Sequence, residues 1–176
     1  MSPGGGAALP RLAALLRVHD ALTRTGFAAA VLLLAVIACS FTYEVTARYL
    51  FNAPTEWASP LVSYSLVAAI FLAMPELTRR KAHMSLNLLA DSVSPAWGAA
   101  MNNVSRTLAA VACLLAAWFC ADATLNQIEL GVWTSPPFAL PKWVISIWLP
   151  YGFLSSGLYF LRALREPPVR AAAPAP

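Results

Sequence analysis

The residues of this chain that could do chemistry are few, and Glu44 and Glu76 are the main candidates. Glu44 follows the first long apolar run, and Glu76 follows Pro75 at the end of the second. Groups that move protons or ions through an apolar environment must be ionisable. Both carboxylates, however, stand at the ends of their runs, so we expect interfacial or helix-packing roles for them and no relay.

Cysteine and histidine offer no metal or haem site. Cys39, Cys113 and Cys120 lie inside apolar runs without CxxC spacing, as is typical of small buried hydrophobic residues. His19 and His83 lie outside the runs, so they cannot be paired axial haem ligands inside a membrane bundle. We therefore expect no cofactor and no metal.

No catalytic constellation is visible either. The sequence contains no HExxH motif, no Gly-rich phosphate loop and no carboxylate cluster, and serines inside the apolar runs have no nearby His and Asp. The net charge is +4, but the basic residues flank apolar runs and do not alternate with aromatic residues on a polar face. We expect no catalytic residues, no enzyme activity and no nucleic-acid partner.

The elements that position these residues are four long apolar runs. The chain is 59% hydrophobic and 11% charged, roughly half the charged fraction of a soluble domain. A helix needs about 20 apolar residues to cross a bilayer, and continuous rather than alternating runs favour helices over a barrel. We predict an all-α membrane protein with four transmembrane helices. They should cover about residues 25–47, 57–77, 101–125 and 143–163.

The basic residues predict the orientation. Ten of the 12 Lys and Arg residues lie in the two tails or the second loop, whereas the first and third loops hold only Arg48 and Lys142. Loops on the cytoplasmic side are enriched in Lys and Arg. Both termini should therefore be cytoplasmic, and the first and third loops should be periplasmic or external.

The two tails differ in character. Residues 1–24 should form a cytoplasmic tail in which residues 9–24 make an amphipathic helix at the membrane surface, because leucines fall near one face and charges elsewhere. The alternatives are a simple continuation of the first span and a frayed tail. Residues 166–176 are low in complexity and should be disordered.

Small residues in the second and third spans would let other helices approach closely. That pattern suits an accessory subunit packed against a larger membrane protein; the alternative is a bundle packed only on itself. No internal repeat is visible, which argues against a self-contained inverted-repeat transporter.

Motifs in three places, in this order, resemble one known family. They are ARYLFNAP over residues 47–54 followed by Trp57, RRKAHMSLNLL over residues 79–89, and PKW over residues 141–143 with LPYGF over residues 149–153. From about residue 20 to 165, the chain resembles the small membrane subunit of tripartite ATP-independent periplasmic (TRAP) transporters, the DctQ-like family. It departs at Ser59 and Pro60, where the family usually has an acidic residue, and at Asn87, where the family often has Asp.

The resemblance implies a function. Such a subunit is a multi-pass protein of the bacterial inner membrane and forms a heterodimer with a large membrane subunit that carries the substrate and sodium sites. A periplasmic solute-binding protein delivers an organic acid, and the small subunit widens the scaffold against which the large subunit moves. The alternatives are a stand-alone small transporter or channel and a membrane electron-transfer or enzyme subunit.

The resemblance also gives candidate residues for contacts with the large subunit or membrane lipids. Four would shape the external corner between the first two spans, four would fix the basic loop, one would kink the last span and one would permit close packing. They are Arg48, Tyr49, Asn52 and Trp57; Arg79, Arg80, Lys81 and His83; Pro150; and Gly152. For the basic group the alternative is a topology signal alone.

Overall fold

The computed structural model describes residues 8–83, 95–134, 136 and 139–165. They form helices α1 (Ala8–Leu50), α2 (Ala58–His83), α4 (Pro95–Glu129), α5 (Lys142–Ser146) and α6 (Trp148–Arg165). Within these residues no strand forms, and Trp133 and Pro141 make an isolated bridge. The second motif from residue 84 onward and the predicted disordered tail over residues 166–176 lie outside the described residues.

Four segments are long and apolar enough to cross a membrane. They are Ala14–Leu50, Ala58–Arg80, Ala100–Glu129 and Lys142–Leu164. The predictions of an all-helical fold and of four helices able to cross a membrane are therefore confirmed for the described residues. Three of the helices extend well beyond the predicted spans, because a helix does not have to end where its first charged residue appears.

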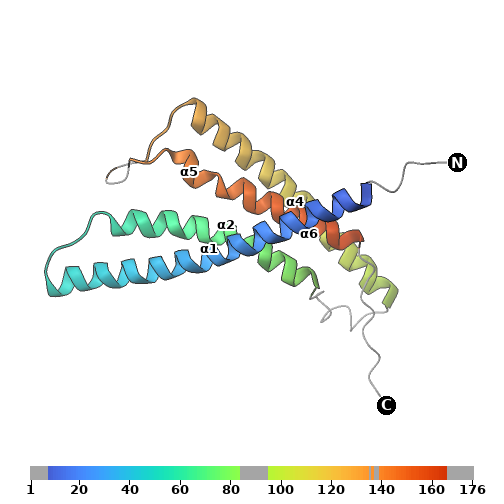
Figure 1. Cartoon of the computed structure of the whole chain (residues 1–176), viewed down its shortest axis with the longest axis horizontal. Helices are drawn as coiled ribbons and strands as arrows, with labels where there is room; N and C mark the ends of the chain where they lie inside the picture. The colour runs from blue at the N-terminus through green and yellow to red at the C-terminus, as the bar shows by residue number, and fades with distance from the viewer. Residues whose placement is uncertain (1–7, 84–94, 135, 137–138, 166–176) are drawn as a thin grey trace, which may run out of the picture.

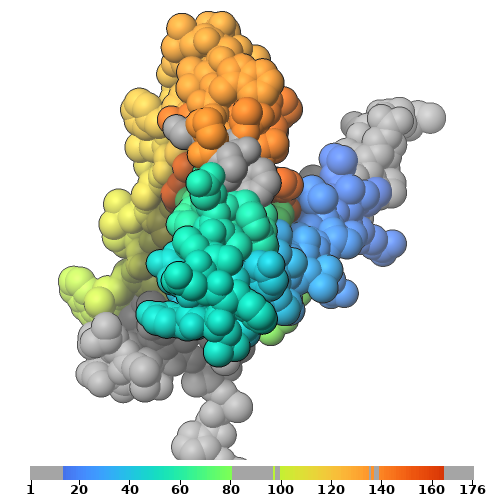
Figure 2. Space-filling view, turned by 90° about the vertical axis from the view of Figure 1, so that its left-hand side faces the viewer, coloured from blue at the N-terminus to red at the C-terminus, as the bar shows by residue number. Residues whose placement is uncertain are grey.

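The helices form two hairpins that cross (Figure 1). One hairpin joins α1 to α2, and the other joins α4 to α5 and α6; α6 packs against both α2 and α4. We call the end with the start of α1 and the end of α6 the terminal end. We call the end with the loops after α1 and α4 the hairpin end, where these two loops form separate projections (Figure 2).

Helix α6 approaches its neighbours closely because it carries glycine on both sides. A Cβ atom at Gly152 would lie 2.7 Å from the backbone oxygen of Phe71 on α2. A Cβ atom at Gly157 would lie 3.2 Å from the side chain of Leu114 on α4. The rings of Phe71 and Phe153 pack beside this contact, with centroids 5.3 Å apart.

Helix α1 is unbroken over 43 residues, which is about 64 Å of helix. Residues 9–24 and the first predicted span therefore belong to one helix, as in the alternative that this segment continues the span. Leu15, Val18 and Leu22 are exposed, whereas Thr23 is fully buried. The polar side of this segment thus faces the bundle and its apolar side faces outward.

The last span is interrupted at Ile147, between α5 and α6. Pro150 has no N–H to donate to the carbonyl of Ser146, the last residue of α5, which gives the break a physical reason. Helix α4 ends differently. Gly131 has a φ of 56°, and the N–H groups of Gly131 and Val132 donate to the carbonyls of Ile128 and Gln127, as in a Schellman motif.

Most large apolar side chains of the described residues face outward, and the buried core is built from small residues and a few large ones. Ala30, Ala69 and Leu72 form its centre between α1 and α2. A soluble helix bundle would bury its large apolar residues. The reversed arrangement fits helices whose surroundings are lipid or another membrane protein.

Candidate functional site

Asp20 on α1 is held by two residues of α6. Arg162 Nη1 donates to Asp20 Oδ1 at 2.6 Å, and Tyr159 Oη donates to the same oxygen at 2.9 Å. The Tyr159 hydroxyl also lies 3.0 Å from Oγ1 of the buried Thr23. The Arg162 guanidinium in turn lies over the Tyr159 ring, 5.3 Å from its centroid.

His19, the neighbour of Asp20, contacts α6 one turn before Tyr159. Its Nε2 shares a hydrogen bond of 2.8 Å with Ser155 Oγ, and its ring centroid lies 4.7 Å from that of Tyr159. The α1–α6 polar network is therefore made of His19, Asp20, Thr23, Ser155, Tyr159 and Arg162. It joins the start of the first hairpin to the end of the second.

Sequence patterns alone did not reveal this network. The expectation that serines inside the apolar runs have no nearby His and Asp is wrong for Ser155, which shares a hydrogen bond with His19, the neighbour of Asp20. One signal was present: Ser155, Tyr159 and Arg162 follow each other at spacings of four and three, so they share one face of a helix. On α1, His19 and Thr23 have a spacing of four. Two such polar faces in apolar surroundings favour pairing with each other.

Glu76 on α2 is only 2% exposed. Arg79 Nε and Nη2 donate to its two oxygens at 2.8 and 2.6 Å, and Arg80 Nε donates at 3.0 Å. The Arg80 guanidinium also lies 5.3 Å from the centroid of the Phe27 ring on α1. Two of the predicted basic residues thus bind a buried carboxylate of their own helix.

The other two basic candidates are described in less detail. Lys81 and His83 lie in the last turn of α2, and their side chains lie outside the described part of the chain. The predicted role of this group in contacts with lipid or the large subunit stays a prediction.

At the hairpin end, Glu44 fixes the loop between α1 and α2. Arg48 Nη2 donates to Glu44 Oε1 at 2.5 Å. Thr55 N–H donates to Oε2 at 3.1 Å, and the Thr55 hydroxyl donates to the same oxygen. The carboxylate therefore ties α1 to the chain just before α2.

The predicted corner residues gather around this contact. Asn52 has a positive φ of 49° where α1 gives way to the loop. The rings of Tyr43 and Trp57 lie 5.7 Å apart and join the helix to the end of the loop. Tyr49 is 80% exposed.

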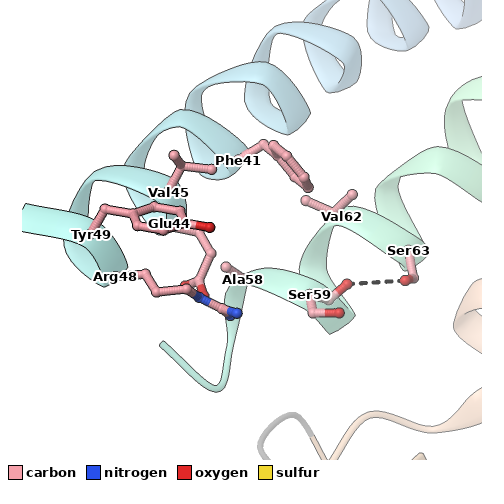
Figure 3. Close-up of a pocket in the computed structure, with 9 residues that line it drawn as sticks. All are labelled: Phe41, Glu44, Val45, Arg48, Tyr49, Ala58, Ser59, Val62 and Ser63. Carbon is pink, nitrogen blue, oxygen red and sulfur yellow. Dashed lines mark hydrogen bonds and ion pairs between the residues drawn. The ribbon is translucent and has the colours of Figure 1, made fainter. Parts of the chain in front are cut away.

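A pocket of about 320 Å³ opens between α1 and α2 beside this corner (Figure 3). Phe41 and Val62 face each other inside it, and the Glu44–Arg48 ion pair lies at its other end. The remaining lining residues are Val45, Tyr49, Ala58, Ser59 and Ser63. Apolar walls with one ion pair suit an apolar group that carries a polar end. Among the residues that line this pocket, no nucleophile lies beside a base.

Metal and redox chemistry find no support in the described part of the chain. No group of three or more His, Cys, Asp or Glu residues there could hold a metal ion. Cys39, Cys113 and Cys120 are all free thiols. The polar side chains described above bind one another.

Comparison with known families identifies the chain. Residues 37–167 match the family described as tripartite ATP-independent periplasmic transporters, DctQ component. The chain belongs to the DctQ family. The predicted resemblance to the small membrane subunit of TRAP transporters is thereby confirmed, as is a multi-pass membrane protein.

The DctQ family is a family of transporter components and not of enzymes. Its members work with a large membrane subunit and a periplasmic binding protein. The matched residues include all of α2, α4, α5 and α6 and the corner around Glu44, but they begin after the α1 half of the polar network. No curated protein and no solved structure matches this DctQ chain.

Proposed function

We propose that this DctQ-family chain is the small permease subunit that scaffolds the large membrane subunit of a sodium-driven secondary transporter. In this proposal the solute is an organic acid, a periplasmic binding protein delivers it, and the complex lies in the bacterial inner membrane. The carrying observation is that Asp20, Glu44 and Glu76 are bound by arginines of the chain itself. A solute or ion path between these helices would need such groups to be free. Asp122, which has no arginine partner in the described residues, is on the exposed side of α4.

The distribution of charge supports a cytoplasmic terminal end. Arg79, Arg80, Arg106 and Arg162 lie at that end of the helices, whereas Arg48 lies at the hairpin end. Basic residues accumulate on the cytoplasmic side of membrane proteins. The hairpin end, with its pocket and its two loops, then faces the periplasm.

The length of α1 supports a surface position for its first part. The helix is about 64 Å long, and the hydrocarbon core of a bilayer is about 30 Å thick. The first turns of α1 therefore extend beyond the core or tilt strongly within it. The exposed Leu15, Val18 and Leu22 would then meet the boundary between acyl chains and headgroups.

The polar network and the corner give the scaffold its shape. Asp20 with Arg162 fixes how the two hairpins cross, and Glu44 with Thr55 fixes the loop between α1 and α2. The exposed Tyr49 and Arg80 have surface available for lipid or the large subunit. Gly152 supports the scaffold in another way, through the close contact of α6 with α2.

Transport in proteoliposomes tests the proposal. We expect the chain alone to move no organic acid, and we expect uptake when the large subunit, the binding protein and a sodium gradient are added. The two membrane subunits should also co-purify in equal amounts from mild detergent. Uptake by the chain alone would instead support a stand-alone transporter, and bound haem or quinone absorbance in the purified chain would support an electron-transfer subunit.

A further inference from the structure

The outer face of α4 carries an apolar stripe with an acidic residue in it. The stripe consists of exposed residues at alternating spacings of three and four, so they share one side of the helix. They are Val104, Leu108, Val111, Leu115, Trp118, Asp122 and Leu125. Phe119, the neighbour of Trp118 in the sequence, is also exposed. Helix α4 runs along one edge of the molecule (Figure 2).

Contacts with α5 and α6 show how deep this stripe lies. Arg106 Nη1 donates to the Ala163 carbonyl at 2.9 Å near one end, and Ser146 Oγ donates to Gln127 Oε1 at 2.8 Å near the other. Between them, Gly157 lies against Leu114. This antiparallel register places Trp118 beside about residue 153, in the middle of the charge-free run over residues 143–161.

Asp122 also lies inside the apolar depth of the bundle. In the same register it stands beside about residues 149–150, and it is about 10 Å along the helix from Glu129. Glu129 lies level with Lys142 and Trp143. This charged and this aromatic residue mark the boundary of the apolar layer at the hairpin end. The hydrogen bond to Asp122 in the described residues comes from Asn126 Nδ2, on the same helix, at 3.4 Å.

Lipid is a poor occupant for this surface. Trp118 is 73% exposed and Phe119 is 68% exposed, yet tryptophan prefers the membrane–water interface to the middle of a span. Ionisable residues inside spans rarely face lipid and usually pair with a partner. The outer face of α1 differs, because it carries no Asp, Glu, Lys, Arg or His between Arg24 and Glu44, and it suits lipid.

We propose that the stripe on α4, with Trp118 and Phe119 as anchors, docks against the large membrane subunit. A cationic or N–H donor side chain of that subunit covers the Asp122 carboxylate. A protein is a better occupant than lipid because the acidic group in this apolar face would be unfavourable against acyl chains. This inference rests on the proposed function, since it assigns a surface to the partner that the proposed function requires.

Co-purification with a tagged large subunit tests the surface. We expect Trp118→Ala, Phe119→Ala and Asp122→Leu each to lower the amount of captured chain by about tenfold. Leu32→Ala, at a residue of α1 that is 68% exposed, should leave capture unchanged. If the unmodified chain and all three α4 variants were captured equally, the assignment of the α4 surface would be wrong and the proposed function would stand. If the unmodified chain were not captured, the proposed function would fail and this proposal with it.

Photo-crosslinking in intact membranes answers the same question without removing a contact. With both subunits co-expressed, Phe119→benzoylphenylalanine should give an adduct of the chain with the large subunit. Leu32→benzoylphenylalanine should give no protein adduct. An adduct from position 119 to a second copy of this chain, or to lipid only, would overturn the proposal even where a variant of the first experiment failed to fold.

Discussion

Asp20 and Arg162 are 142 positions apart in the sequence, and their side chains meet at 2.6 Å. The ion pair joins the first described helix to the last one at a point where the two hairpins cross. Each side chain is 31% exposed, so water screens the pair only in part. The crossing of the hairpins therefore depends on a few polar side chains together with the packing of α6 on α2.

Removal of Asp20 should weaken this crossing. Asp20→Ala leaves Arg162 and the Tyr159 hydroxyl without their shared acceptor, and we expect it to lower the free energy of unfolding in detergent by about 1–3 kcal/mol. Denaturation followed by circular dichroism measures the change. Arg17→Ala, at an exposed residue of the same helix, is the matched control and should have little effect.

A double-mutant cycle separates the pair from its surroundings. Asp20→Ala, Arg162→Ala and the double variant should give a coupling free energy of about 1 kcal/mol, the size found for polar contacts between membrane helices. Strictly additive effects would show that the two side chains do not stabilise each other.

Replacement of Gly152 should force α6 away from α2. Gly152→Ala places a methyl group 2.7 Å from the Phe71 carbonyl oxygen, and backbone cannot move aside as a side chain can. We expect a loss of about 1–3 kcal/mol in unfolding free energy. Gly157→Ala meets the flexible Leu114 side chain at 3.2 Å and Cys113 Cβ at 3.5 Å, an ordinary contact, and should cost less. Equal stability of the two variants would contradict the close contact.

Neutralisation of Glu76 should be costly for the end of α2. Glu76→Ala leaves the Arg79 guanidinium, which is 25% exposed, without its carboxylate, and breaking a buried pair costs about 3 kcal/mol. Thermal unfolding of the purified chain in detergent measures the loss. Glu56→Ala removes an exposed carboxylate and serves as the comparison; a similar melting temperature for both variants would argue against the structural role of Glu76.

The corner after α1 needs a residue that tolerates positive φ. Asn52 has a φ of 49°, a conformation that glycine adopts freely and that a β-branched residue resists. Asn52→Gly should leave stability nearly unchanged, whereas Asn52→Val should cost about 1–2 kcal/mol. Unfolding curves of both variants in detergent decide the matter, and a stable Val variant would mean that the loop adopts another conformation.

The sequence predicted the helices well because apolar runs bounded by charges report directly on membrane crossing. It left the extent of α1 open, because an amphipathic helix over residues 9–24 and a simple continuation of the first span both fit the pattern. Helix α1 runs unbroken through Arg17, Asp20 and Arg24. Helical backbone bonds continue through such residues when a neighbouring helix supplies partners for the side chains. The residue at which a span leaves the apolar layer and the residue at which its helix ends therefore need not be the same.

The contacts between helices were harder to predict. Periodicity shows which residues of one helix share a face, but it does not show which other helix that face meets. Tyr159 and Thr23 are 136 positions apart, and only the crossing of the hairpins brings them together. The corner residues Arg48, Asn52 and Trp57 were expected from the family resemblance, and the structure adds that Arg48 binds Glu44, one turn away on the same helix.

The polar network also has a consequence for biosynthesis. His19, Asp20 and Thr23 leave the ribosome well before Ser155, Tyr159 and Arg162 do. While the chain is being made, the polar side of the first helix has no partner from α6 and must stay hydrated. The insertion of the final helix removes that water, so a chain stopped before α6 should be recognised as unfinished and degraded.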